Sequence, residues 1–271
     1  DTDDDKRFRD SLPDATAEDK DLRYSLREQT APKHTKTAYA VFIVKQHEDG
    51  SVTLHPKMIA DEAVGAPPHT WLNADTGKIK RDKQGEPIQN TRGRVSVRDA
   101  KGAPLAWRPG KHLAAYPNAS QFAVEGDTKG VRDRLPDNVV FFEVEYAADR
   151  DYQLEAWEYG VNGNGKYEHS QAGLPYIPKD GYYIYRTNAN PNIPAMIITG
   201  AYRVKRALTD EEAKKLNQEA GGDWYDRKSG EPMTAERLKE LGLDEAGLQR
   251  KAETFDYNEL EPAHDESSVA M

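Results

Sequence analysis

Short apolar segments separated by long polar stretches are the feature of this sequence that most constrains its fold. The clearest is residues 139–146 (VVFFEVEY), which begins as an apolar run and then alternates, with Glu143 and Glu145 on one face. Each such segment has the length of a β-strand and is rich in the β-branched and aromatic residues that strands favour. The other segments of this kind are residues 39–46 (YAVFIVKQ), 182–186 (YYIYR) and 196–205 (MIITGAYRVK). The pattern predicts a protein built around a β-sheet.

Turn and capping signals indicate how these strands are connected. Residues 47–50 (HEDG) predict a tight turn into a second strand over residues 51–55, which makes a β-hairpin. Asp149 predicts the N-cap of a helix that continues to Glu158 and stops at Gly160. Gly200, inside a strand pattern, predicts a bulge or a close approach of two backbones.

The C-terminal part of the chain carries helix signals. Thr209 followed by Glu212 fits a capping box, which predicts a helix to about residue 220. Residues 234–241 and 244–253 predict two more short helices. The fold class expected from the whole pattern is α+β: a mostly antiparallel, curved sheet with one flanking helix and a helical C-terminal tail.

Charge divides the 271-residue chain into three parts. Residues 1–36 form an acidic linker or arm, residues 37–208 an α+β core domain, and residues 209–271 an acidic helical tail. The tail alone carries 17 acidic and 8 basic side chains, whereas the net charge of the whole chain is −9. Because the middle of the chain is slightly basic, the overall acidity does not exclude an anionic ligand.

A basic loop interrupts the core domain. Residues 73–104 contain eight Lys or Arg and four acidic residues, and the segment is too long for an ordinary connection. Arg92, Arg94 and Arg98 are therefore candidates for contacts with nucleic acid. The alternative is a solvated insertion without a ligand.

Composition excludes several classes of protein. The chain has no cysteine, so it has no disulfide framework and no thiol nucleophile. Its seven histidines are scattered, and we expect no metal site. No stretch approaches the ~18 consecutive apolar residues of a membrane span, so we expect no membrane partner. The opening DTDDDKRFRD does not have the pattern of a signal peptide, and we expect a cytoplasmic piece excised from a longer polypeptide.

The segment WRPGKHLAAY, residues 107–116, is the most suggestive for chemistry. Within six positions it contains Arg108, a Pro-Gly turn and His112, at the expected end of a short strand over residues 105–108. Polar side chains on a loop held by a strand are frequent ligand contacts. On YYIYR, Tyr183 and Tyr185 share one face and could stack on a nucleobase or nicotinamide ring. The structural alternatives are that Arg108 pairs with a carboxylate, that His112 caps a helix, and that the tyrosines belong to a sheet covered by the tail.

Several longer runs carry a family resemblance. RYSLRE, WRPGKHLAAYP, FFEVEYAADRDYQLEAWEYGVNGNGKYEHSQAGLP, DGYYIYRTNANP and IITGAYRVKRALTDEE resemble the accessory domains of large polyvalent proteins. Those are very long multidomain proteins of phages and conjugative elements, and the resemblance covers roughly residues 23–212. It implies that the partners of this chain are other modules of a longer parent protein in a bacterial host cell.

A second resemblance, at the level of the fold, is to ADP-ribosyltransferases of the H-Y-E type. It implies NAD as the ligand, with Arg108 and His112 in the binding site, His112 contacting the ribose of NAD, and Tyr183 or Tyr185 stacking on nicotinamide. Those enzymes carry a Glu on a late strand, but residues 196–205 contain none, so Glu143 or Glu145 would have to replace it.

Three function classes follow. The first is a mobile-element module with an ADP-ribosyltransferase-like pocket, active or degenerate. The second is a nucleic-acid-binding module that uses the basic loop, and the third is a scaffold that docks other parts of its parent protein.

Overall fold

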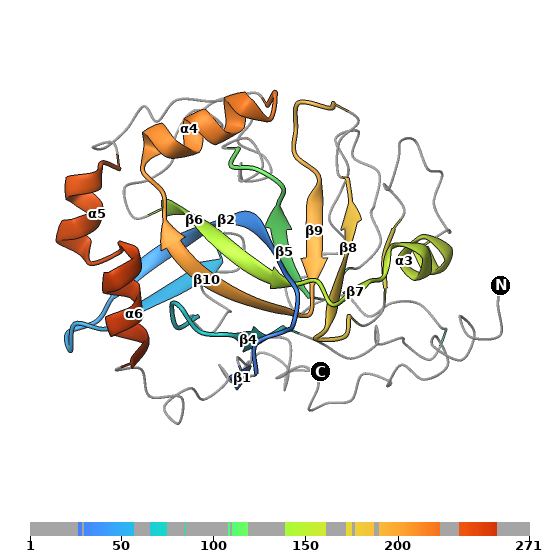
Figure 1. Ribbon diagram of the computed structural model, residues 1–271, viewed down its shortest axis with the longest axis horizontal. Helices are drawn as coiled ribbons and strands as arrows, with labels where there is room; N and C mark the ends of the chain where they lie inside the picture. The colour runs from blue at the N-terminus through green and yellow to red at the C-terminus, as the bar shows by residue number, and fades with distance from the viewer. Residues whose placement is uncertain are drawn as a thin grey trace.

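The computed structural model describes residues 27–28, 30–56, 66–74, 84, 108, 110–118, 139–160, 172–174, 177–186, 190–222 and 233–253. These residues form one ten-stranded sheet and four helices (Figure 1). The strands are β1 (Arg27–Glu28), β2 (Thr35–Gln46), β3 (Val52–Pro56), β4 (Leu72–Asn73), β5 (Lys111–Ala114), β6 (Val139–Ala147), β7 (Arg150–Asp151), β8 (Gly181–Tyr185), β9 (Met196–Thr199) and β10 (Ala201–Ala207). The helices are α3 (Gln153–Gly160), α4 (Asp210–Glu219), α5 (Ala235–Leu241) and α6 (Glu245–Glu253).

The sheet is almost entirely antiparallel. Its strand order is β1-β4-β10-β6-β2-β5-β9-β8-β7, and β3 pairs with β2. The one parallel pair is β7 with β8. The longest ladder joins β2 and β6 at the centre, where two strong strand patterns of the sequence meet. The expected α+β fold class, with a mostly antiparallel sheet and C-terminal helices, is confirmed.

The sheet is strongly curved. Tyr146 on β6 and Tyr182 on β8 have ring centroids 5.3 Å apart, although β2, β5 and β9 lie between their strands in the sheet order. The side on which these rings meet is therefore the concave face. Gly200 lies where β9 ends and β10 begins, and a Cβ there would collide with the backbone of Pro178. The close approach expected at this glycine is confirmed.

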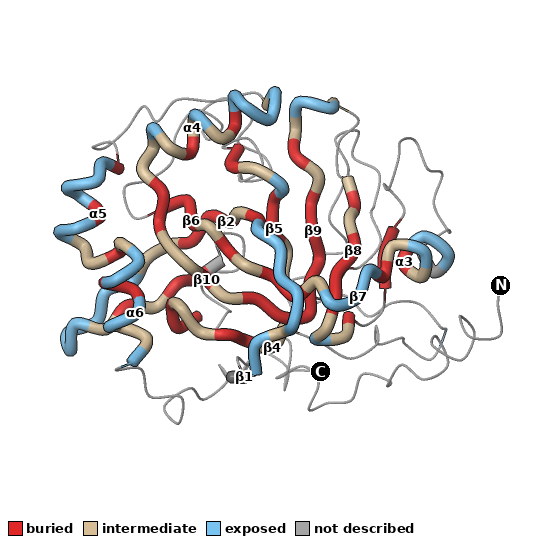
Figure 2. The backbone as a smooth tube through the Cα atoms, in the orientation of Figure 1, coloured by how far each residue is buried: buried red, intermediate tan, exposed pale blue. Residues whose placement is uncertain are grey.

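Buried apolar residues gather on both faces, and Figure 2 shows the central strands as the most buried part of the chain. The main cluster fills the concave face, and α5 and α6 add Leu238 and Leu248 to it. Two smaller clusters cover the convex face, one under α4 and one around Tyr183 and Tyr185. Since α5 and α6 contribute buried side chains, they form part of the core.

Most local predictions are confirmed. The hairpin of β2 and β3 forms with Gly50 at φ +82° in its turn. The capping box of α4 is complete, because Thr209 accepts from the Glu212 backbone N–H and Glu212 accepts from the Thr209 backbone N–H.

One local prediction is wrong, and another lies outside the described residues. The Asp149 side chain does not cap α3; it accepts from the backbone N–H groups of Lys33 and His34, and Asp151 accepts from the first residue of the helix instead. The short strand expected over residues 105–108 stays a prediction, because residues 105–107 lie outside the described residues; a further strand that was not expected, β5, follows Gly110.

Gly110 explains where β5 begins. Its φ is +119°, which favours glycine, and a Cβ would lie 2.6 Å from the side chain of Ile177. After this turn the chain enters the sheet as β5, between β2 and β9. His112 therefore lies inside the sheet and not at its margin.

Candidate functional site

Strand β5 places the candidate residues of the WRPGKH segment beside the tyrosines of β8. His112 is paired with Ile198 of β9, and Ile198 is paired in turn with Tyr183 of β8. Residues opposite each other in adjacent strands project to the same face, so His112 and Tyr183 lie on the convex face. Tyr185, two residues along β8, lies on that face as well.

The imidazole of His112 is held by two hydrogen bonds. Its Nε2 lies 2.7 Å from the backbone oxygen of Arg108, and its Nδ1 lies 3.0 Å from the Tyr185 hydroxyl. Because a carbonyl oxygen only accepts, Nε2 carries the proton, and Nδ1 therefore accepts from Tyr185. The ring is fixed in one tautomer.

The charge state of His112 follows from its surroundings. Burial, helped by the positive charges of Arg108 and Lys111, outweighs the Arg108 hydrogen bond and lowers the pKa of His112 to about 4. The imidazole is therefore neutral at pH 7, the state in which it donates to the Arg108 carbonyl and accepts from the Tyr185 hydroxyl.

Arg108 is the cationic side chain of the group. It is only 6% exposed, its Nε donates to the backbone oxygen of Ala172 at 2.6 Å, and its guanidinium carbon lies 4.1 Å from the centroid of the Tyr185 ring. Stacking of this kind fixes the plane of the guanidinium. We call Arg108, His112 and Tyr185 together the β5 cluster.

Tyr183 has a different environment. It is fully buried in the convex-face cluster, and its hydroxyl accepts from the Leu174 backbone N–H at 3.4 Å. Burial raises the pKa of Tyr183, which keeps the phenol neutral. Its ring is a packing element, and the expectation that Tyr183 or Tyr185 presents a ring face to a ligand does not fit their burial, because Tyr185 is only 2% exposed and stacks on Arg108.

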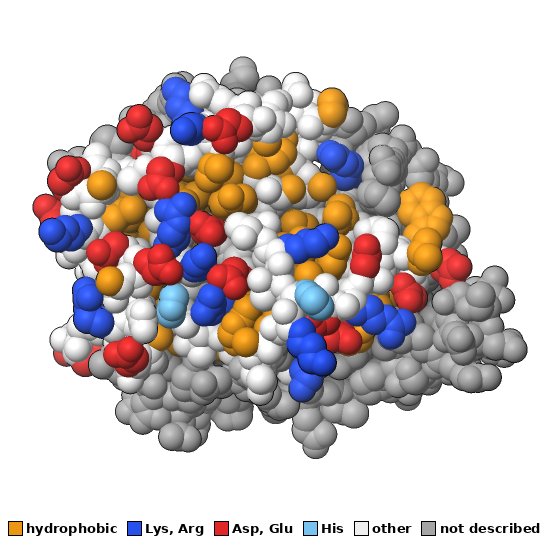
Figure 3. All heavy atoms as spheres, viewed as in Figure 1, with side chains coloured by type: hydrophobic (Ala, Val, Ile, Leu, Met, Phe, Trp, Pro, Cys, Tyr) orange, Lys and Arg blue, Asp and Glu red, His pale blue; other side chains and the backbone are white. Residues whose placement is uncertain are grey.

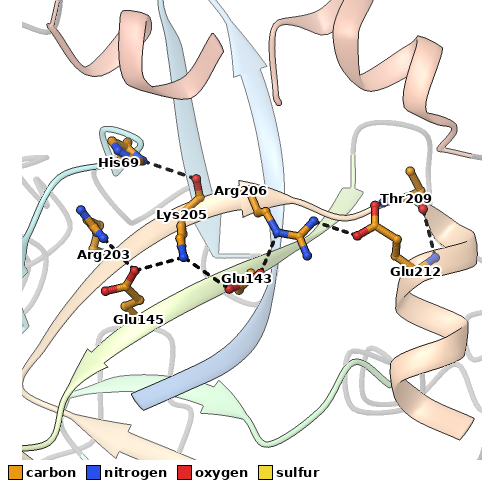
Figure 4. Close-up of polar contacts among 8 residues, drawn as sticks. All are labelled: His69, Glu143, Glu145, Arg203, Lys205, Arg206, Thr209 and Glu212. Carbon is orange, nitrogen blue, oxygen red and sulfur yellow. Dashed lines mark hydrogen bonds and ion pairs between the residues drawn. The ribbon is translucent and has the colours of Figure 1, made fainter. Parts of the chain in front are cut away.

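The two candidate carboxylates lie elsewhere. Glu143 and Glu145 face β10, where Arg206 donates to Glu143 at 2.7 Å and Arg203 donates to Glu145 at 2.7 Å (Figure 4). The Lys205 ammonium bridges them, at 3.9 Å from Glu143 and 3.6 Å from Glu145. Since β2 separates β6 from β5, the structure does not bring either carboxylate to His112.

The ion pairs continue from the sheet into α4. Arg206 also donates to Glu212 at 2.7 Å. Burial pushes the pKa of Glu212 upward, but the hydrogen bonds from Arg206 and Thr209 outweigh it and hold this pKa below its usual range. Figure 3 shows basic and acidic side chains interspersed over β6 and β10, the arrangement of an ion-paired surface.

The basic-loop arginines, metal sites and membrane spans remain to be described. Arg92, Arg94 and Arg98 lie outside the described residues, so their expected contact with nucleic acid stays a prediction. Within the described ranges, no group of three or more His, Asp and Glu side chains is placed to hold a metal ion. No helix in the same ranges is both long and apolar enough to cross a membrane.

One residue of β5 was missed by sequence reasoning. Lys111, next to His112, projects to the opposite, concave face, where its ammonium lies over aromatic rings. The alternation of a strand could have indicated this, but the sequence analysis placed the strand before the Pro-Gly turn and not after it.

Comparisons with family models, with curated proteins and with solved structures find no match to this chain.

Proposed function

We propose that this chain is a nucleotide-binding module of a large polyvalent protein from a phage or conjugative element, with an ADP-ribosyltransferase-like site that binds without transfer. The observation that carries the proposal is the hydrogen bond between His112 and Tyr185, which joins the two residue types that the resemblance assigns to NAD. The module would act in the host bacterial cell, joined to other modules of its parent protein.

The β5 cluster supports binding of an anionic, hydrogen-bonding ligand. His112 is partly exposed and neutral, and its hydrogen bonds to Arg108 and Tyr185 engage both ring nitrogens, so it offers a ligand an uncharged ring held in a fixed orientation. Arg108 supplies the positive charge, and its guanidinium is held in a fixed orientation by stacking on the Tyr185 ring. Together they suit a sugar ring next to a phosphate, the phosphate lying toward Arg108.

The carboxylates favour a degenerate site. Transfer of ADP-ribose needs a Glu that orients the acceptor and stabilises the cationic transition state. Glu143 and Glu145 are both ion-paired with β10, and β9 contains no acidic residue. Replacement of the missing Glu by either of them would require the sheet to be rebuilt.

The test is calorimetric titration of the protein with NAD and with ADP-ribose, together with an assay for released nicotinamide. We expect both ligands to bind and nicotinamide to stay attached. Tyr185→Phe removes the hydrogen bond that fixes the His112 ring and keeps the aromatic ring, so the ligand must itself order His112; this should weaken binding about five- to tenfold, the effect of about 1 kcal/mol for ordering one side chain. The matched control is Tyr146→Phe on the concave face, which should leave the affinity unchanged.

A second candidate function is docking of another module of the parent protein. Leu154 and Trp157 lie one turn apart on α3 and are 77% and 41% exposed. Large apolar side chains exposed together indicate an interaction surface. Photo-crosslinking from position 157 in the parent polypeptide should capture a second module, and cross-links confined to the residues that flank α3 would count against docking.

A further inference from the structure

Two histidine side chains meet on the hairpin of β2 and β3. His47 lies in the turn and His55 on β3, and the Nε2 atoms of both rings contact the hydroxyl oxygen of Thr53, at 2.8 Å and 2.7 Å. Val52 and Leu54 belong to the main apolar cluster on the concave face, so Thr53 and His55, which alternate with them along β3, project to the opposite face. The hairpin therefore directs two imidazoles to one point on that face.

The spacing of the two nitrogens is close to that required by one metal ion. Because both Nε2 atoms contact the same oxygen, they lie at most about 5.5 Å apart, whereas two imidazoles on one zinc ion, each bonded at about 2.0 Å, lie about 3.3 Å apart. A shift of about 1 Å at each ring closes this difference, and rotation about the side-chain bonds can supply it. The two rings can therefore bind the same ion.

The hydrogen bonds at Thr53 determine where the nitrogen lone pairs point. A hydroxyl group has one proton, so Thr53 donates to one ring and accepts from the Nε2–H of the other. One Nε2 lone pair is therefore already directed to the point where the rings meet. The second ring presents its lone pair there once its proton moves from Nε2 to Nδ1, the other neutral tautomer. Binding of an ion by the neutral pair thus releases no proton.

We propose that His47 and His55 form a two-histidine site for a divalent transition-metal ion, with copper(II) bound more tightly than zinc(II). Imidazole nitrogen suits both ions, and the general order of affinities places copper(II) above zinc(II). Two protein ligands leave coordination positions open, and water can fill them because His47 is exposed and Thr53 is half-buried. Magnesium and calcium ions, which require several oxygen ligands, should not bind here.

Lys45 offers a way to strengthen the site. It is paired with Thr53 across the hairpin, so its side chain projects to the same face as the two histidines. Lys45 is exposed, and its ammonium group repels a second cation on this face. Lys45→His removes the charge and adds a third imidazole, which gives the three protein ligands typical of a catalytic zinc site. The variant should therefore bind metal more tightly than the wild type.

The experiment is calorimetric titration of the full chain with copper(II), zinc(II) and magnesium in turn. We expect copper(II) to bind at least tenfold more tightly than zinc(II), and magnesium not to bind. His47→Gln and His55→Gln should each weaken copper(II) binding at least tenfold, while His34→Gln, at an exposed histidine outside the hairpin, should leave it unchanged. Lys45→His should tighten it at least tenfold. Electron paramagnetic resonance of the copper(II) complex should show two imidazole nitrogens on the ion.

Equal copper(II) affinities of His47→Gln and His34→Gln would overturn the proposal, and so would a copper(II) complex with fewer than two imidazole nitrogens. Tighter binding of zinc(II) than of copper(II) would overturn the assignment of the ion. If His55→Gln fails to fold, His47→Gln and Lys45→His still decide the result, because both positions are exposed. The outcome is also independent of NAD binding, since none of these residues belongs to the β5 cluster.

Discussion

Acid should destabilise this protein through His112. The folded-state pKa of His112 is about 4, against 6.5 for an ordinary histidine. Between these two values the unfolded chain binds a proton at this position and the folded chain does not. Stability therefore falls as the pH drops from about 6.5 toward 4, because stability rises with pH wherever the unfolded state binds more protons.

The size of the effect follows from the two pKa values. One pKa unit corresponds to about 1.4 kcal/mol, so the full loss below pH 4 approaches about 3 kcal/mol. At pH 5 the unfolded histidine is almost fully protonated and the folded one is not, which gives a loss of at most about 2 kcal/mol relative to pH 7.5. Against the 5–15 kcal/mol typical of a folded domain, a change of about 2 kcal/mol is measurable.

Urea unfolding of wild type and His112→Gln at pH 7.5, 6 and 5 isolates this contribution from that of the many carboxylates. Glutamine can donate to the Arg108 carbonyl but does not titrate. The free energy of unfolding of the variant therefore has no pH dependence from position 112. The stability advantage of wild type over His112→Gln should shrink by about 2 kcal/mol between pH 7.5 and pH 5. An advantage that stays constant across this range would refute a His112 that is held neutral in the folded protein; His47→Gln, at an exposed histidine, is the control variant.

Three further changes have defined outcomes. Gly200→Ala should destabilise the protein by about 1–3 kcal/mol or more, because the new Cβ meets the backbone of Pro178; thermal unfolding measures this, and an unchanged Tm would contradict it. Thr209→Ala should cost about 1 kcal/mol in urea unfolding through loss of the capping box of α4, whereas Thr209→Ser should restore most of it. Neutralising Arg92, Arg94 and Arg98 together should weaken any DNA binding and flatten its salt dependence, and an unchanged salt slope would remove the basis for a nucleic-acid contact.

The fold was predictable wherever the signal was local. Residues 139–146 and 39–46 lie in the central strands, as expected of short apolar runs rich in β-branched and aromatic residues. The α4 capping box was predictable because its two hydrogen bonds lie within four residues.

Long-range contacts account for the errors. Asp149 has the sequence context of an N-cap, but backbone N–H groups more than a hundred residues away compete for its carboxylate. The start of β5 depends on Gly110 fitting against Ile177 and Ile198, which no local pattern records.

In the candidate site, too, the local features were predictable and the long-range contacts were not. That Tyr183 and Tyr185 share a face follows from strand alternation, yet the full burial of Tyr183 depends on which segments cover that face. Likewise, Glu143 and Glu145 were correctly expected on one face, while their pairing with β10 depends on the strand order.

NMR during addition of NAD tests the central claim most directly: the nitrogen-15 resonances of the histidine rings report where NAD binds, and the nicotinamide resonances report whether it stays intact. In the free protein we expect His112 to be neutral with its proton on Nε2. On addition of NAD, its ring resonances should shift while those of the exposed His47 stay in place, and the nicotinamide resonances should remain those of intact NAD. Unshifted His112 resonances at millimolar NAD would contradict a nucleotide site at the β5 cluster, and the appearance of free nicotinamide would contradict binding without transfer.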